Sequence, residues 1–285
     1  MVIPNFRPIF VKAFQSWQSD NAPRLAAAFA FYAMLALAPM VVLAVAVASH
    51  FLGQSQGGMH IVHVMEEYLG KSGSAFLENM IQNAAQPGTT TVATILSLLV
   101  ATFGAVNLFE QLFDAVNTIW GVKGRGGFKG FLINKVTSVM MFIVFSAVFV
   151  IWLAIDSWLG WVEVHTHGFQ GWQLISILVS VIFLTLVFAM SFRALPRRMV
   201  AWSDVWLGAV VTAFGFALSK LLLSLYFSFT SLTAYGSAGA LVIILLWIYY
   251  SAQIYFFGIE LTCTYAHMYG SQTQRHKGEQ PIPNH

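Results

Sequence analysis

Four ionisable side chains interrupt long apolar stretches of the sequence, and their chemistry stands out. They are Glu110, Asp156, Lys220 and Glu260. A charged group at the centre of a bilayer costs about 2.5–3.5 kcal/mol on insertion scales, so such groups face protein or water and are functional candidates. Buried carboxylates and an ammonium can form ion pairs, relay protons or contact an anionic cargo.

Polar residues recur at helical spacing around Glu110. Asn107, Glu110, Asp114 and Asn117 follow one another at intervals of three, four and three residues, which places them on one helical face. Two interpretations are open. Either the helix end emerges into water and Glu110 pairs with a nearby basic residue, or this face lines a water-filled vestibule.

A second polar stripe contains Glu260. Tyr249, Gln253 and Glu260 are separated by four and seven residues, again on one helical face. We expect Glu260 to lie at a depth similar to that of Glu110, where Arg193 can neutralise either carboxylate. A structural ion pair is one interpretation, because carboxylates inside a bundle need partners. Coupling to a proton or a cargo is the other.

Lys220 lies about eight residues, or about 12 Å, from the external end of its apolar stretch. Its ammonium either reaches the lipid interface along its own stem or faces inward, toward Asp156, Tyr249 or Gln253. Facing inward, it would contact an anionic group or form a switchable pair with Asp156. The candidate residues of a translocation path are therefore Lys220, Glu110, Glu260, Asn107, Asp114, Asn117, Gln253, Tyr249, Asp156 and Arg193.

The elements that must position these residues are apolar helices. The 285-residue chain is 58% hydrophobic and 9% charged, whereas soluble domains carry about 25% charged residues. A helix needs about 20 apolar residues to cross a bilayer. The sequence predicts an all-α integral membrane protein, a bundle of six transmembrane helices over Ala26–Phe51, Val92–Phe113, Val136–Trp158, Trp172–Phe192, Val205–Phe227 and Ala240–Ala266.

The distribution of Lys and Arg predicts the orientation of these helices. If the six runs cross the membrane in turn, 12 of the 14 basic residues lie on one side. Basic residues near helix ends stay in the cytoplasm, so both termini are predicted to be cytoplasmic. The 12 residues are Arg7, Lys12, Arg24, Lys123, Arg125, Lys129, Lys135, Arg193, Arg197, Arg198, Arg275 and Lys277.

Residues 1–268 are predicted to form a single transmembrane domain. Within it, residues 59–86 carry apolar side chains at helical spacing, which indicates short amphipathic helices on the external face, lying on the bilayer or capping the bundle. Residues 269–285 are polar and are expected to be a disordered cytoplasmic tail. Pro39 is expected to kink the first span, and Gly236 and Gly239 to let helices pack closely.

The sequence argues against several kinds of chemistry. The lone cysteine, Cys263, excludes a disulfide within the chain. His60, His63 and Glu66 share a helical spacing but lack further ligands, so we expect no metal. The sequence has no nucleotide-binding, hydrolase or zinc-protease motif. We therefore expect no cofactor and no enzymatic activity.

Several segments resemble the YihY/BrkB family over about residues 15 to 268. They are Asp20–Pro23, Phe29–Tyr32, Asn117–Trp120, Leu195–Arg197, Tyr235–Ala240, Leu246–Gln253 and Gly258–Glu260, together with Pro39 and Lys220. The resemblance implies a six-helix bacterial inner-membrane protein. Members have carried the names virulence factor BrkB and ribonuclease BN. The basic residues here are scattered, without an acid–base or metal constellation, which argues against ribonuclease activity and a nucleic-acid partner.

Two functions remain as expectations. The first is a transporter or translocator of lipid, or of another anionic amphiphile, in envelope biogenesis, with membrane lipids as partners and energy from a gradient or another protein. The second is a non-transporting scaffold or assembly factor with a closed bundle, acting as a homo-oligomer or with an envelope-complex partner. Buried charges that border a hydrated space would favour the first function.

Overall fold

The described part of the chain is helical. The computed structural model describes residues 6–52, 59, 62, 66, 74–79, 81–82, 91–122, 127–165, 172–229 and 236–272. Seven long helices account for most of these residues, and none of the described residues forms a strand. The prediction of an all-helical protein is confirmed.

Each predicted span lies inside one long helix. Stretches of three of these helices are long and apolar enough to cross a membrane, judged by length and composition: Ile175–Ala194, Trp202–Ser219 and Leu241–Met268. Six crossings and cytoplasmic termini therefore stay predictions. The six helices are α2 (Ala22–Leu52), α4 (Thr91–Ile119), α5 (Gly127–His165), α6 (Trp172–Ala194), α7 (Trp202–Phe229) and α8 (Gly236–Met268).

A further helix, α1 (Phe6–Ser19), precedes the first predicted span. The search for long apolar runs missed it, because Arg7 and Lys12 interrupt its apolar residues. A tight turn joins α1 to α2, with Asn21 in the left-handed region at a φ of 54°. Asparagine tolerates this conformation better than most residues. Pro23 follows in the first turn of α2, where a missing N–H costs little.

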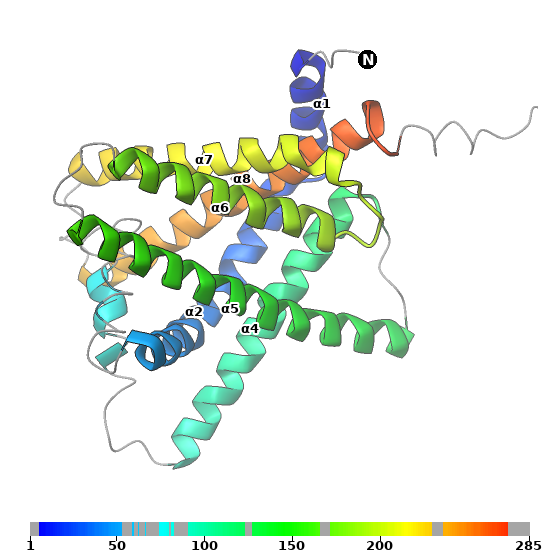
Figure 1. The fold of residues 1–285 in the computed structure, drawn as a ribbon. Coiled ribbons are helices and arrows are strands. Elements are labelled where there is room, and N and C mark those ends of the chain that lie inside the picture. The colour runs from blue at the N-terminus through cyan, green and yellow to red at the C-terminus, as the bar shows by residue number, and fades with distance from the viewer. Residues whose placement is uncertain are drawn as a thin grey trace, which may run out of the picture.

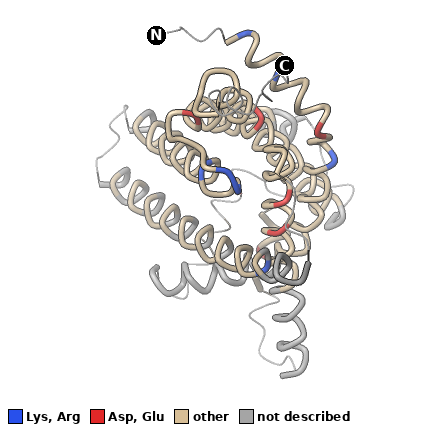
Figure 2. The backbone as a smooth tube through the Cα atoms, turned by 90° about the vertical axis from the view of Figure 1, so that its right-hand side faces the viewer, with Lys and Arg blue, Asp and Glu red and all other residues tan. Residues whose placement is uncertain are grey.

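The long helices pack around α8. Helix α7 packs against both α6 and α8, whereas α2 packs against α4 and α8, and α5 rests mainly on α4. Figure 1 shows α1 standing out from the bundle, steeply inclined to α7. The end of α4, the start of α7 and the end of α8 lie toward the same end of the molecule, which faces the viewer in Figure 2.

The small residues of α2 form its packing face. Ala26, Ala30, Ala33 and Ala36 are all buried. A Cβ atom added to Gly104 of α4 would lie 3.0 Å from the carbonyl oxygen of Leu35. The two backbones are therefore close, as small residues allow in membrane bundles. Helix α2 continues through Pro39, although the side chain at this position lies outside the described part, and the predicted kink is untested.

A reciprocal pair of Gly–Thr contacts joins α7 and α8. A Cβ on Gly208 would lie 2.0 Å from Thr262 Oγ1, and one on Gly258 would lie 1.7 Å from Thr212 Oγ1. Each threonine hydroxyl also donates to the glycine carbonyl one turn earlier on its own helix, over 2.7 Å in α7 and 2.9 Å in α8. These glycines differ from the two predicted: Gly239 is buried, and the surroundings of Gly236 lie outside the described part.

One turn of the predicted external segment is described, at residues 74–79. Leu77 of this turn is almost fully buried, at 1% exposure, in a core cluster with Ala33, Leu108 and Ile244. Here the segment packs on α2, α4 and α8. Most of residues 59–86, and all of the tail beyond 272, lie outside the described residues, so their predicted roles are untested.

We predict that Gly258→Ala destabilises the protein by about 1–3 kcal/mol, because the added methyl group overlaps Thr212 and the helices must separate. Thermal unfolding in detergent should show a lower melting temperature. Ala147→Val, which adds bulk at an exposed position of α5, is the control and should leave the melting temperature near that of the wild type. Equal melting temperatures for Gly258→Ala and wild type would contradict the packing described here.

Candidate functional site

The polar face of α4 meets a lysine from α5. The Nζ atom of Lys135 donates to Glu110 Oε2 over 2.5 Å and to Asn107 Oδ1 over 3.1 Å. The side chains of Lys135 and Glu110 are 28% and 22% exposed. Screening by solvent is therefore limited, and the hydrogen bonds carry charge, which makes them stronger than neutral ones.

Lys135 is therefore the basic residue that pairs with Glu110. Arg193, the residue proposed to neutralise it, is exposed, and its guanidinium lies 4.4 Å above the ring centre of Trp202. The apolar runs predict that Lys135 lies in a loop before the third span. It lies instead inside α5, which begins at Gly127, well before the predicted span. A helix can extend beyond its apolar run, and hydropathy alone does not detect that extension.

An apolar trough lies beside Lys135. It has a volume of about 370 Å³, and its other lining residues are Val106 of α4 and Val136, Val139, Met140 and Ile143 of α5. The last four are well exposed on the surface of the bundle. The trough therefore opens outward, where lipid surrounds a membrane protein, and its described lining is apolar although it includes Lys135.

At the C-terminal end of α4, the last residue of its polar face has a different role. Asn117 is buried: its Oδ1 atom accepts from the backbone N–H of Arg197 over 2.8 Å, and its Nδ2 atom donates to the Phe113 carbonyl over 2.7 Å. The guanidinium of Arg197 lies 4.6 Å above the Phe113 ring centre. Asn117 thus ties the α6–α7 connection to the end of α4, which is a structural task.

Asp114 is the exposed member of the stripe and lies one residue beyond the predicted span. Partial burial of its carboxyl raises the pKa of Asp114, and the nearby Glu110 carboxylate raises it further, while the Arg197 guanidinium lowers it. These neighbours place Asp114 between the Lys135 pair and the α6–α7 connection. The stripe therefore spans two local polar clusters.

Helix α4 ends in a hydrogen-bonded turn that supports Asn117. Gly121 adopts a φ of 63°, its N–H donates to the Thr118 carbonyl, and the N–H of Val122 donates to the Asn117 carbonyl, both over 2.9 Å. This is the Schellman arrangement, in which a left-handed residue satisfies the last carbonyls of a helix. The turn aims Trp120 into the main core cluster.

Five segments of the family resemblance meet in that core cluster. Each contributes a residue that is buried there: Ala22, Trp120, Leu195, Ala252 and Ile259. The described part of the protein thus gives these segments a shared packing role at one end of the bundle.

Glu260 lies in a separate environment. Its side chain is 1% exposed, and its Oε1 atom has no hydrogen-bond partner among the described residues. The neighbouring charged group is Asp20, from the turn between α1 and α2. Glu110 and Glu260 therefore lie in different polar surroundings, and Arg193 is paired with neither carboxylate among the described contacts. Whether either carboxylate serves a translocation path stays a prediction.

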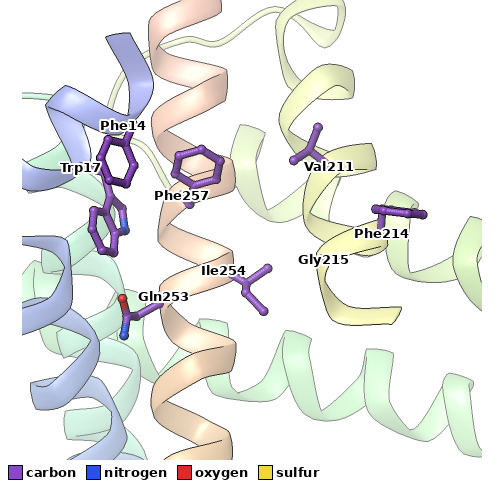
Figure 3. A pocket seen from close by; sticks show the side chains of 8 residues that line it. All are labelled: Phe14, Trp17, Val211, Phe214, Gly215, Gln253, Ile254 and Phe257. Carbon is purple, nitrogen blue, oxygen red and sulfur yellow. The ribbon is translucent and has the colours of Figure 1, made fainter. Parts of the chain in front are cut away.

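Gln253 lines a second apolar cavity, a groove of about 420 Å³ between α1, α7 and α8. Figure 3 shows its amide below the indole of Trp17. The Nε1 atom of Trp17 is buried and has no hydrogen-bond partner in the described part of the chain. Tyr249, one turn before Gln253, packs against both core clusters and against Tyr250.

Two candidate residues cannot be placed in a site. Asp156 and Lys220 lie within α5 and α7, but their side chains fall outside the described part. A residue that the sequence analysis did not select is Asp204, which is 1% exposed in the first turn of α7. It accepts from Ser271 Oγ over 2.6 Å and from the Ser271 N–H over 3.0 Å. An acidic residue in the first turn of a helix is favoured by the helix dipole, but the contact with Ser271, beyond the end of α8, has no signal in the sequence.

Apolar helices long enough to cross a bilayer, with few and locally paired charges, define a helical membrane protein. The chain belongs to the family described as Virulence factor BrkB, whose model matches residues 13–283. The resemblance seen in the sequence is confirmed.

Relatives named UPF0761 membrane protein are similar to this chain at low sequence identity. The protein from Ralstonia nicotianae is 27% identical over 92% of this chain and 59% of its own length. The protein from Alteromonas mediterranea is 25% identical over 96% of this chain and 93% of its own length. The protein from Azotobacter vinelandii is 26% identical over 88% of this chain and 61% of its own length. This chain thus spans about three fifths of two of these relatives. No solved structure matches it.

We predict that Lys135→Met destabilises the protein by about 1–3 kcal/mol, because a half-buried carboxylate loses its charged donor. Unfolding in detergent should show this cost, and the cost should shrink in a Glu110→Gln background, where no charge is left unpaired. Lys12→Met, at an exposed position of α1, is the control for loss of one positive charge. The same cost in both backgrounds would show that the pair is not energetically coupled.

Proposed function

We propose that the protein binds an anionic amphiphile, such as a phospholipid, and moves it across the bacterial inner membrane. The observation that carries this proposal is the trough between α4 and α5, whose apolar lining includes Lys135, a residue whose ammonium pairs with Glu110. An acyl chain matches the walls, because apolar surface favours apolar contact. A phosphate matches Lys135, which binds anions as a point charge.

The ion pair gives the trough a means of exchange. Lys135 contacts Glu110 and Asn107, so an incoming phosphate competes with the Glu110 carboxylate for the same ammonium. The ammonium can therefore bind either Glu110 or the phosphate. A translocation cycle needs two such alternative states. Lys135 takes the role that the sequence analysis gave to Lys220, whose side chain is not described.

The proposal includes six membrane crossings, with both termini in the cytoplasm. Six helices contain the six apolar runs, and Figure 2 looks onto the end where basic residues of the α6–α7 connection lie near the middle. Their position supports the cytoplasmic assignment of this end by the positive-inside rule. The sequence has no ATPase motif, so the proposal assigns the energy to a gradient or a partner protein and assigns no catalytic residue.

A second candidate function is a non-transporting scaffold for envelope complexes. It is favoured by two polar contacts that join segments: Asn117 ties the α6–α7 connection to α4, and Asp204 ties the start of α7 to the segment after α8. A scaffold needs a stable bundle and no exchange at Lys135. The two functions therefore differ in one measurable property, movement of lipid.

We predict that the purified chain, reconstituted in phosphatidylethanolamine–phosphatidylglycerol vesicles, exposes tail-labelled fluorescent phosphatidylglycerol of the inner leaflet to external dithionite. Lys135→Met should slow this movement at least several-fold, because the anion contact is lost. Arg24→Gln, at an exposed position at the start of α2, removes the same charge elsewhere and should leave the rate unchanged.

Each outcome of this experiment decides one part of the proposal. Wild-type protein that moves lipid no faster than empty vesicles overturns translocation and favours the scaffold. Lipid movement that is equally fast in Lys135→Met keeps translocation but removes Lys135 and the trough from the path.

A further inference from the structure

Helix α1 packs on the bundle through one narrow face. Ile9 and Ala13, four residues apart, are fully buried and contact a cluster that contains Leu261 and Tyr265 of α8 and Leu207 of α7. The partners on α8 lie in its last turns, and Leu207 lies in the first turns of α7. Helix α1 is therefore fixed at the level where two apolar membrane helices end and begin.

A second face of α1 carries large aromatic side chains, and the bundle leaves three of them well exposed while it partly covers Trp17. Phe6, Phe10, Phe14 and Trp17 recur at intervals of four, four and three residues, so they share one side of the helix. Phe6 is 53% exposed, Phe10 is 38% exposed and Phe14 is 49% exposed. We call these four residues the aromatic stripe. An exposed apolar stripe next to a polar face indicates a contact surface.

The remaining exposed surface of α1 is mostly polar and carries positive charge, with Val11 as an exposed apolar residue within it. Arg7, Lys12, Gln15 and Gln18 are exposed, and the helix contains no acidic residue. A helix with basic residues on its polar side and phenylalanine or tryptophan on the other is typical of helices that lie in a membrane surface. Its positive charge matches anionic lipid headgroups, to which each basic residue contributes about 1 kcal/mol near the surface.

The direction of α1 agrees with such a position. Figure 1 shows α1 steeply inclined to α7, and the apolar stretches of α7 and α8 have the length and composition to cross a membrane. A helix that crosses these two at a steep angle near their ends lies along the membrane surface rather than through it.

The aromatic stripe continues into the groove behind α1. Phe14 and Trp17, whose rings stack at 5.7 Å, line this groove together with Val211 of α7 and Phe257 of α8. Figure 3 shows these side chains around the space between the three helices. The accessible lining of the groove is apolar, and the indole Nε1 atom of Trp17 is buried. An acyl chain matches this lining, because apolar surface favours apolar contact.

We propose that α1 lies in the surface of an anionic leaflet, with its aromatic stripe inserted among the lipids and one phospholipid chain in the groove between α1, α7 and α8. This inference is independent of lipid translocation, because it requires only that α1 packs stably on α7 and α8. The occupant is a phospholipid of the same leaflet, since the stripe and the groove form one continuous apolar surface beside basic residues.

The position of α1 is tested with nitroxide labels on single introduced cysteines, read by electron paramagnetic resonance in vesicles that contain phosphatidylglycerol. Cys263 is buried, so the wild-type protein is the unlabelled blank. Labels at Phe10→Cys and Phe6→Cys should collide with oxygen in preference to a water-soluble nickel chelate. A label at Gln15→Cys, on the polar side of the same helix, should show the opposite preference.

Other results overturn the proposal. Equal access of the nickel chelate to positions 10 and 15 would mean that α1 lies in water. Protection of position 10 from both oxygen and nickel would mean that the stripe contacts protein, such as a second copy of the chain. Loss of the oxygen preference in Phe10→Cys alone, with Phe6→Cys unaffected, would restrict insertion to the start of α1 and exclude the continuous surface.

The groove is tested by its lipid content. Val211→Trp places bulk in the groove, whereas Val210→Trp places the same bulk at an exposed neighbouring position of α7. Native mass spectrometry of the purified protein should show at least several-fold less bound phospholipid for Val211→Trp than for wild type or Val210→Trp. Equal amounts in all three proteins would exclude the groove as the lipid site.

Discussion

The close contact between α7 and α8 is the constraint on which much of the described structure depends. Gly208 and Gly258 each make room for a threonine of the other helix, and no larger residue fits without separating the backbones. In a membrane, apolar burial gives little drive for helices to associate, so such close packing and its dispersion contacts supply much of the stability. Helix α6 rests on α7, and α2 rests on α8, so the position of both depends on this contact.

The same contact also forms the surface on which α1 packs. Ile9 and Ala13 pack across the line where α7 and α8 meet, and the groove lies on the same side of the pair. A wider separation of the two helices would remove both features. The Gly–Thr contacts between α7 and α8 thus determine two features. One is the packing of the interior, and the other is the surface proposed to bind lipid.

Charged and polar groups are satisfied locally rather than across a shared central site. Lys135 serves Glu110 and Asn107, Asn117 serves the α6–α7 connection, and Asp204 serves the end of α8. Each pairing joins segments that are already neighbours through apolar contacts. This arrangement keeps the cost of burying these polar groups low, because each of them finds a partner at short range. The exceptions among the described residues are Glu260 Oε1, which lies beside Asp20, and the indole Nε1 atoms of Trp17 and Trp120.

The sequence by itself determined the helical class, the location of the apolar helices and the membership of a membrane-protein family. These depend on composition and on runs of about 20 apolar residues, which are local properties of the chain. It also indicated the helical faces of Glu110 and Glu260, because helical spacing is local too. It missed α1, whose basic residues break the apolar run that hydropathy detects.

Only the tertiary structure decided which side chains meet. Lys135 lies 25 residues from Glu110, and many basic residues of the sequence were equally acceptable partners for that carboxylate. The packing role of Gly208 and Gly258 was hidden as well, because a glycine in an apolar run has the same pattern whether it faces lipid or another helix. Pairing and close approach depend on the rotation and tilt of whole helices, which are set by the sum of many contacts and not by any one segment.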